Sequence, residues 1–394
     1  MSAVRRWARR LGLAVAGALV TAVLLGVAAH ASPTFGAALA DAVREVAGPA
    51  VVAWAEDVTY DVEDRIKGLV YADAAPKQFW DQPDASAPPP APGFVSVTAD
   101  ASVRAAFLPK AFDPPVAKVA GRTDGQWLAV ADPDGPGDPL FFKTLVHPDA
   151  KRSYAAVAVV AIDLARLNLS LAAGTVEPVS PVVSREQRPG LVPADALADL
   201  VAAFNGGFKA EHGHYGMMVD GVVLLPPRER ACTIAITDEG AVHIAGALDP
   251  ELARSVRSSR QTPPCLVEDG ELDDRLVAAD DSKRWGAAVG GATVIRRSAL
   301  GVSADGKTLF YGLGDSVTAG ALARAMKAAG ADDAAQLDVN AAYPRFLFYA
   351  HPKDEPPAVD SPLIPDLKFG PHEYVREPEP RDFFFLTRKR PGAT

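Results

Sequence analysis

The segment that follows residues 200–203 combines polar side chains and glycines more densely than any other part of the chain. Because residues 200–203 are apolar, Asn205 is expected at the end of a strand, where binding sites are commonly built. Gly206 and Gly207 would let backbone amides approach a ligand closely, and Lys209 would attract an anion. A tight turn with surface side chains is the alternative interpretation, since Asn-Gly and Gly-Gly are common in turns.

Two histidines, His212 and His214, stand two positions apart in the same segment. On a strand this spacing places both rings on one face. A zinc site needs a third ligand, and no other histidine has matching spacing, so neither a metal nor another cofactor is predicted. General acid–base chemistry or hydrogen bonding is the expected use of these rings.

Two charged residues accompany apolar segments further along the chain. Arg297 begins an apolar segment, where it could bind phosphate through two hydrogen bonds or stay solvated at a sheet edge. Asp338 lies within the apolar segment 334–339, and burying a carboxylate is costly unless it is paired or functional. Asp338 is therefore either a structural partner or a catalytic carboxylate.

The sequence Gly314-Asp315-Ser316 resembles the nucleophile block of the SGNH lipase and esterase family. That family has a downstream histidine preceded at short spacing by an aspartate, a pattern that neither His351 nor His372 shows. Alternatively, Ser316 or Thr318 caps a helix that begins at residue 319. An esterase that uses Ser316 as its nucleophile is one functional alternative.

The elements that must position these residues read as many hairpins and few helices, which is typical of an α+β fold with mixed, largely antiparallel sheets. The expected strands are 154–163, 167–172, 334–339 and 383–386, the hairpin turns are 219–222, 237–241 and 300–307, and the main helix is 319–329.

The chain divides into four predicted parts. Residues 1–31 form a signal peptide or membrane anchor, residues 32–75 a helical segment, residues 76–93 a proline-rich linker, and residues 94–390 the main domain.

The N-terminus carries the pattern of an export signal. Four arginines precede an uncharged apolar run over residues 11–29, and Ala29-His30-Ala31 follows as a cleavage site. Cleavage and retention as a membrane anchor both stay open, because the run is long enough to span a bilayer. Either outcome places the rest of the chain outside the cytoplasm, in the periplasm or secreted.

Composition excludes some functional classes. With 40 basic and 49 acidic residues the net charge is −9, which argues against a nucleic-acid partner. The only two cysteines, Cys232 and Cys265, are too few for a disulfide scaffold or a four-thiolate zinc site. In an oxidising compartment they are a candidate disulfide, whereas in a reducing one they are small apolar residues.

The order of these motifs is more specific than any one of them. Asn-Gly-Gly-Phe at 205–208 is followed by Arg-Ser-Ala-Leu-Gly at 297–301, by the threonine-capped helix, and by Leu-Asp at 337–338. This set resembles the phosphodiester glycosidase family over about residues 150–350. The resemblance assigns Asn205, Gly206, Gly207, Arg297 and Asp338 to family motif positions.

The resemblance implies an exported hydrolase that cleaves a sugar-1-phosphodiester in envelope or exopolysaccharide glycans, with a carbohydrate or sugar-phosphate as its partner. Asp338 would be the nucleophile or base, and Arg297 the phosphate clamp, assisted by Lys209 or Arg345. His212 or His214 would protonate or bind the leaving side of the substrate. The residues expected to contact the substrate are Gly206, Gly207, Phe208, Lys209, Asn340, Tyr343 and Arg345.

The chain departs from one branch of the family after Asp338. That branch continues with Gly-Gly-Gly-Ser, whereas this chain has Val-Asn-Ala-Ala-Tyr at 339–343 and resembles a bacterial subgroup. A catalytically silent envelope protein that binds glycans or serves as a scaffold is therefore the alternative from another class.

Overall fold

The computed structural model describes residues 62, 64–71, 75–80, 107–278, 282–286 and 294–390. The chain divides into two compact units, Met1–Thr59 and Tyr60–Thr394, and all described residues belong to the second. The predicted signal or anchor and most of the helical segment and linker lie outside the described residues. Within the described part, none of the helices has the length and apolar character needed to cross a membrane.

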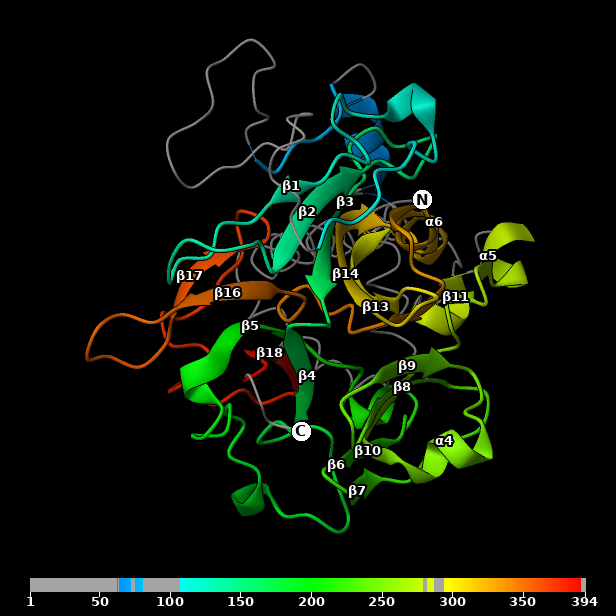
Figure 1. The fold of residues 1–394 in the computed structure, drawn as a ribbon. Helices are drawn as coiled ribbons and strands as arrows, with labels where there is room; N and C mark the ends of the chain where they lie inside the picture. The colour runs from blue at the N-terminus through cyan, green and yellow to red at the C-terminus, as the bar shows by residue number, and fades with distance from the viewer. Residues whose placement is uncertain are drawn as a thin grey trace, which may run out of the picture. The chain divides into compact units, whose positions relative to one another are not determined.

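The fold is α+β, as predicted, and its strands form three antiparallel sheets (Figure 1). The eight-stranded sheet runs, in spatial order, β1 (Leu128–Ala129), β2 (Phe141–Val146), β3 (Ala156–Asp163), β14 (Thr308–Val317), β13 (Ile295–Val302), β15 (Asp333–Gln336), β11 (Val267–Glu268) and β12 (Glu271–Leu272).

The two other sheets have five strands each. One runs β7 (Val222–Leu225), β6 (Met217–Val219), β10 (Val256–Thr262), β8 (Cys232–Thr237) and β9 (Val242–Ala245). The other runs β17 (Ala358–Pro362), β16 (Phe346–Ala350), β5 (Leu200–Asn205), β18 (Phe383–Arg388) and β4 (Leu167–Ala172).

Helices are short. The α-helices of the described chain that have named bounds are α4 (Pro250–Arg254), α5 (Asp274–Ala278) and α6 (Ala319–Ala329). The 3₁₀ helices are η1 (Ala117–Val119), η2 (Arg185–Gln187), η3 (Leu197–Asp199), η4 (Ala210–His212) and η5 (Ser282–Trp285).

Helix α6 follows the predicted capping pattern. The Thr318 side chain accepts a hydrogen bond from the Ala321 amide, and Gly330 ends the helix at φ 107°, a conformation that glycine adopts easily. The buried side of the helix packs on β13 and β14. Thr318 rather than Ser316 is therefore the cap.

Strand β15 ends earlier than the sequence predicted. It stops at Gln336 instead of 339, because the Asp338 side chain accepts hydrogen bonds from the amides of Val339 (2.7 Å) and Asn340 (3.1 Å). This local turn offers the backbone an alternative to the ladder, and it places Asp338 in the loop at the strand end.

An aromatic cluster packs the eight-stranded sheet against the sheet that contains β5. The Phe204 and Phe346 rings stack with centroids 5.4 Å apart, and the Tyr311 ring lies 5.1 Å from Phe346. Tyr311 belongs to β14 and the two phenylalanines to β5 and β16. The ends of β5 and β14 are thus held in one core.

A disulfide joins Cys232, at the start of β8, to Cys265, just before β11, with a Cα–Cα distance of 4.8 Å. It therefore ties the β7–β9 sheet to the eight-stranded sheet. The cysteines are 33 residues apart, so the bond closes a long loop in the unfolded chain.

Replacing both cysteines by alanine is expected to lower the free energy of unfolding by about 2–4 kcal/mol, because the unfolded chain regains the freedom of that loop. Guanidinium denaturation without reductant measures the change. Thiol titration of the denatured, non-reduced wild type should find no free thiol, and two free thiols would contradict the disulfide.

Candidate active site

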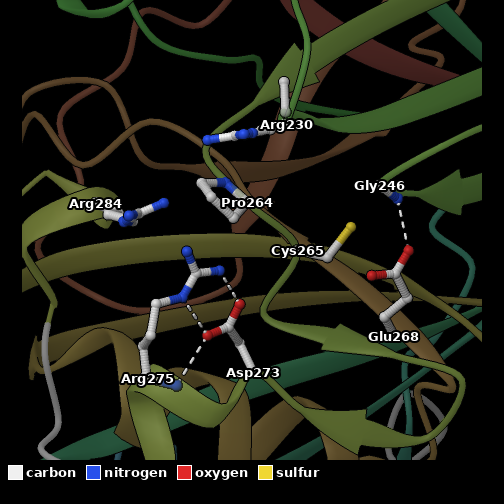
Figure 2. A pocket seen from close by; sticks show the side chains of 9 residues that line it. Arg230, Gly246, Pro264, Cys265, Glu268, Asp273, Arg275 and Arg284 are labelled. Atoms are coloured by element: carbon white, nitrogen blue, oxygen red, sulfur yellow. Dashed lines mark hydrogen bonds and ion pairs between the residues drawn. The ribbon is translucent and has the colours of Figure 1, made fainter.

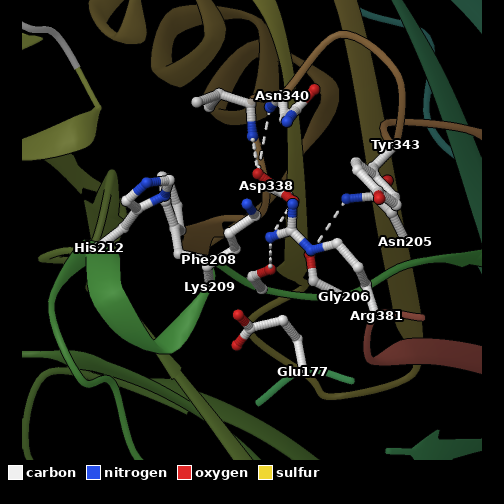
Figure 3. A network of polar contacts seen from close by, with 12 residues as sticks. Glu177, Asn205, Gly206, Phe208, Lys209, His212, Asp338, Asn340, Tyr343 and Arg381 are labelled. Carbon is white, nitrogen blue, oxygen red and sulfur yellow. Dashed lines mark hydrogen bonds and ion pairs between the residues drawn. The ribbon is translucent and has the colours of Figure 1, made fainter. Parts of the chain in front are cut away.

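Asp338 lies at the centre of a polar network built at the ends of β5, β15 and β18 (Figure 3). Its side chain is 3% exposed, and its amide donates to the Gly206 carbonyl oxygen over 3.1 Å. Burial raises the pKa of the Asp338 carboxyl above its usual range, although Arg381 and two backbone amides oppose this shift. The structure thus joins the Asn-Gly-Gly turn to the Leu-Asp motif directly.

Arg381 is the cation that faces Asp338. The two side chains form a buried ion pair, and Arg381 also donates to the Gly207 carbonyl oxygen over 3.2 Å. The Tyr343 ring covers the guanidinium at 4.5 Å from its centroid. Within the described chain, the Nε and Nη1 atoms of Arg381 are buried and have no hydrogen-bond partner.

Such unsatisfied donors are rare in folded proteins, and each is expensive unless a ligand or water meets it. A buried guanidinium N–H without a protein partner can donate a charge-assisted hydrogen bond to a phosphate oxygen. Arg381 is therefore suited to hold an anionic substrate group beside the Asp338 carboxylate.

The Gly206–Gly207 turn is fixed by a second buried ion pair. Arg260 of β10 contacts Asp382 over 2.9 Å, and both side chains are fully buried. Asp382 accepts from the Gly207 amide through its side chain and from the Gly206 amide through its backbone oxygen.

These contacts correct the expected role of the glycines. A Cβ atom at Gly206 would lie 2.1 Å from the Asp382 carboxylate, and one at Gly207 would lie 2.7 Å from the Arg260 guanidinium. The glycines are needed for this close packing, and their amides bind Asp382 rather than a ligand.

Asn205 holds the network in place from beneath. Its side-chain amide donates to Ser298 Oγ over 2.9 Å, and its side-chain oxygen accepts from the Tyr311 hydroxyl over 2.7 Å. Ser298 Oγ in turn donates to the Asp338 carbonyl oxygen. Asn205 is 4% exposed, so it positions Asp338 rather than contacting a substrate.

Arg297 is not placed to clamp a phosphate, which corrects the expectation from the sequence. Its side chain is fully buried, and its guanidinium donates to the carbonyl oxygens of Val317 and Trp285 and to the Gln336 side chain. The arginine fastens η5 and β14 to β15 from inside the fold.

Arg345 also has a structural role. Its guanidinium pairs with Glu373 over 2.5 Å and donates to the Ala342 carbonyl oxygen over 2.9 Å. The second carboxylate near it is Glu379, at 4.0 Å. Arg345 therefore neutralises these acids and does not assist as a free cation.

Lys209, Phe208, Asn340 and Tyr343 surround the Asp338–Arg381 pair in Figure 3. Lys209 is a quarter exposed and forms a loose contact of 3.5 Å with Glu211. Asn340 is exposed and accepts from the Ala342 amide, while Phe208 is buried. The structure places all four beside the buried pair.

The two histidines do not lie on a strand, so the expectation that they share a sheet face is wrong. His212 ends η4, and His214 follows in a left-handed turn at φ 50°. Desolvation lowers the pKa of His212, with Lys209 and Arg381 acting in the same direction against Glu211 and Asp338. His212 lies within electrostatic range of Asp338, whereas His214 is an exposed turn residue.

Ser316 has no histidine partner within the described chain. Its hydroxyl accepts a hydrogen bond from Lys67 over 2.7 Å. Nor do the described residues contain a group of three or more acidic, histidine or cysteine side chains arranged to hold a metal ion.

Comparison with known proteins shows a phosphodiester glycosidase sequence profile over residues 198–338. This segment belongs to the phosphodiester glycosidase family. It begins just before β5 and ends at Asp338, so it contains both motifs that meet in the network.

None of the curated proteins matches the chain. Among solved structures, the zebrafish N-acetylglucosamine-1-phosphodiester α-N-acetylglucosaminidase catalytic domain, auto-inhibited by its pro-peptide, is similar with a TM-score of 0.40 and 15% identity. That match covers 66% of this chain and 87% of the zebrafish one. A protein from Synechocystis is similar with a TM-score of 0.36 and 11% identity, covering 63% of this chain and 62% of that chain.

Four residues of this network were not predicted from the sequence: Arg260, Glu379, Arg381 and Asp382. Three of them occur in Glu379-Pro380-Arg381-Asp382, directly before the apolar strand β18. A charged group at the entrance to an apolar strand was the available signal. The pairing of Phe383 with Asn205 is what brings it to the Gly206–Gly207 turn.

Asp382→Asn is expected to lower the free energy of unfolding by about 3–5 kcal/mol, since it leaves the buried Arg260 charge without its partner. Urea denaturation measures this. The matched control is Asp360→Asn on β17, an exposed carboxylate whose loss should change stability by no more than about 0.5 kcal/mol. Equal stabilities of the two variants would contradict the role assigned to the ion pair.

Glu379 gives the network a pH dependence. Burial, opposed by Arg345, raises the pKa of this carboxyl from 4.5 to about 7. The folded protein therefore binds more protons than the unfolded chain between these pH values, and Glu379 loses stabilising effect as the pH rises through about 7.

Glu379→Gln should accordingly be more stable than the wild type at pH 8, by about 1–3 kcal/mol, with a smaller difference at pH 5. Thermal and urea unfolding at both pH values test this. The control Glu355→Gln removes an exposed carboxylate and should show no such divergence. A Glu379→Gln variant that is less stable at pH 8 than at pH 5, relative to the wild type, would refute it.

Proposed function

We propose that the protein hydrolyses a sugar-1-phosphodiester outside the cytoplasm, with Asp338 and Arg381 at the reacting centre. The family acts on sugar phosphodiesters, and the observation that carries the proposal for this chain is the buried Arg381 with two unpartnered donors beside Asp338. Envelope or exopolysaccharide glycans are the proposed substrates.

The chemistry requires that the bond between the anomeric carbon and the phosphate oxygen breaks while a water oxygen joins the carbon. The oxocarbenium-like centre that develops needs a carboxylate, and the departing phosphate gains negative charge. Asp338 would serve as nucleophile or as the base that takes the proton of water. Arg381 would donate a charge-assisted hydrogen bond to a phosphate oxygen from one of its two unpartnered N–H groups.

The environment of these groups supports this division of roles. Tyr343 lies over the Arg381 guanidinium and limits its movement, and Asp338 is buried, so its charge is poorly hydrated and its pKa is raised. A poorly hydrated carboxylate is more reactive towards a nearby cationic centre or a water proton. His212 is the remaining candidate for protonating or binding the leaving side of the substrate.

Export is part of the proposal. The Cys232–Cys265 disulfide supports an oxidising compartment, because disulfides persist mainly in exported proteins. The arginine-led apolar N-terminus supports it independently. A membrane partner would follow only if that segment is retained.

Asp338→Asn and Arg381→Gln are each expected to lower kcat/KM for activated sugar-1-phosphodiesters about a hundredfold or more, because each removes a charge that the transition state needs. Release of reducing sugar measures turnover, and circular dichroism verifies the fold. The matched control Arg376→Gln removes an exposed arginine and should keep full activity.

Other outcomes would point to the alternatives. Absence of turnover on a broad panel, with glycan binding unaffected by either substitution, would favour the silent glycan-binding or scaffold protein. Ester hydrolysis that is lost in Ser316→Ala and retained in Asp338→Asn would favour the esterase.

A further inference from the structure

A cavity of about 230 Å³ opens beside Cys265, one half of the disulfide (Figure 2). Its wall contains Pro264, Cys265 and three arginines, Arg230, Arg275 and Arg284. Figure 2 shows the three guanidinium groups directed into the space around Pro264. The chain as a whole is acidic, so this concentration of arginines runs against its average charge.

The two carboxylates of the cavity are already engaged. Asp273 pairs with Arg275, accepting from its Nε over 2.7 Å, and Glu268 accepts from the Gly246 amide over 2.8 Å. Arg230 and Arg284 form no hydrogen bond or ion pair with any residue that the structure describes. The cavity therefore presents two cations whose donors are available to an anion.

Arg230 is also held in a costly backbone conformation. Its φ angle of 59° lies in the left-handed region, which side-chain-bearing residues rarely adopt. A glycine would adopt this φ angle with less strain, so the backbone at Arg230 is strained.

The short segment Arg284-Trp285-Gly286 connects the cavity to the Asp338 network. A Cβ atom at Gly286 would lie 3.1 Å from Val339 and 3.2 Å from Phe208, so Gly286 contacts the immediate neighbour of Asp338. Two residues span at most about 7 Å, which places the Arg284 backbone within about 7 Å of the Gly286 backbone. A substrate longer than one sugar can reach both places.

We propose that this arginine pocket binds a second phosphate group, carried by the glycan part of the substrate away from the bond that is cleaved. Guanidinium groups bind phosphate through paired hydrogen bonds, and a phosphate monoester offers three terminal oxygens to converging arginines where a carboxylate offers two. Naming the ligand as part of the substrate rests on the proposed function, whereas phosphate binding by the pocket does not.

The first experiment measures binding by isothermal titration calorimetry with inorganic phosphate, glucose 6-phosphate and glucuronate. Arg230→Gly and the double variant Arg230→Gly/Arg284→Gln should weaken both phosphate ligands about tenfold or more, because charge-assisted hydrogen bonds are lost. Arg230→Gly should melt no lower than the wild type, since glycine suits φ 59°. Arg254→Gln, at the exposed end of α4, is the matched control and should bind as the wild type.

The Arg381→Gln variant distinguishes phosphate binding in this pocket from phosphate binding at the proposed reacting centre. If phosphate binding is lost only in Arg381→Gln, or if the wild type binds no phosphate, the pocket proposal is overturned. If the Arg230 and Arg284 substitutions weaken the binding of inorganic phosphate and of glucose 6-phosphate equally, the phosphate group itself is the ligand. Glucuronate affected in place of phosphate would overturn the assignment to phosphate.

The second experiment compares sugar-1-phosphodiesters with and without an additional phosphate on the glycan. The double variant should raise the KM ratio of the phosphorylated to the unphosphorylated substrate about tenfold, with the kcat ratio little changed. If the wild type turns over neither substrate, the proposed function fails while the calorimetry still decides the pocket. Turnover with an unchanged KM ratio would overturn the pocket as a substrate site.

Discussion

The ion pair between Arg260 and Asp382 connects parts of the chain that are distant in sequence, and the geometry of the candidate site depends on it. Arg260 belongs to β10, and Asp382 directly precedes β18 in another sheet. The remaining donors of Arg260 bind the carbonyl oxygens of Tyr215, Phe208 and Gln261. Because both side chains are fully buried, neither can be supported by water in place of the other.

This pair also explains how Arg381 and Asp338, the proposed reacting groups, are positioned. Asp382 is the neighbour of Arg381, so fixing its carboxylate fixes the direction from which Arg381 approaches Asp338. On the opposite side, the Asn205–Ser298 and Ser298–Asp338 hydrogen bonds fix the Asp338 backbone carbonyl, and the Val339 and Asn340 amides hold its carboxylate. A charged pair held from both sides needs little rearrangement when a ligand binds, which is the usual basis of electrostatic preorganisation.

The sequence predicted the α+β class, the main hairpins and the capped helix, because each depends on local pattern: alternating apolar residues, turn dipeptides and a threonine cap. It also singled out Asn205 and Asp338, since polar residues at the ends of apolar strands are conspicuous. It failed for Arg297, because a strand arginine that faces the interior and binds carbonyl oxygens has the same local sequence as one that faces solvent. Arg381 was missed because only the long-range pairing of β18 with β5 brings it to the site.

Residues 64–71 and 75–80 give the domain a boundary that family similarity does not show. Asp64 accepts hydrogen bonds from Arg152 and Tyr154, and Lys77 pairs with Asp315 at the end of β14. A recombinant fragment that starts at residue 94 would lack these partners of Arg152, Tyr154 and Asp315. The contacts of the domain thus extend more than a hundred residues upstream of the segment that matches the family. Truncation at residue 198 would in addition remove β3 and leave the edge of β14 unpaired, which favours aggregation.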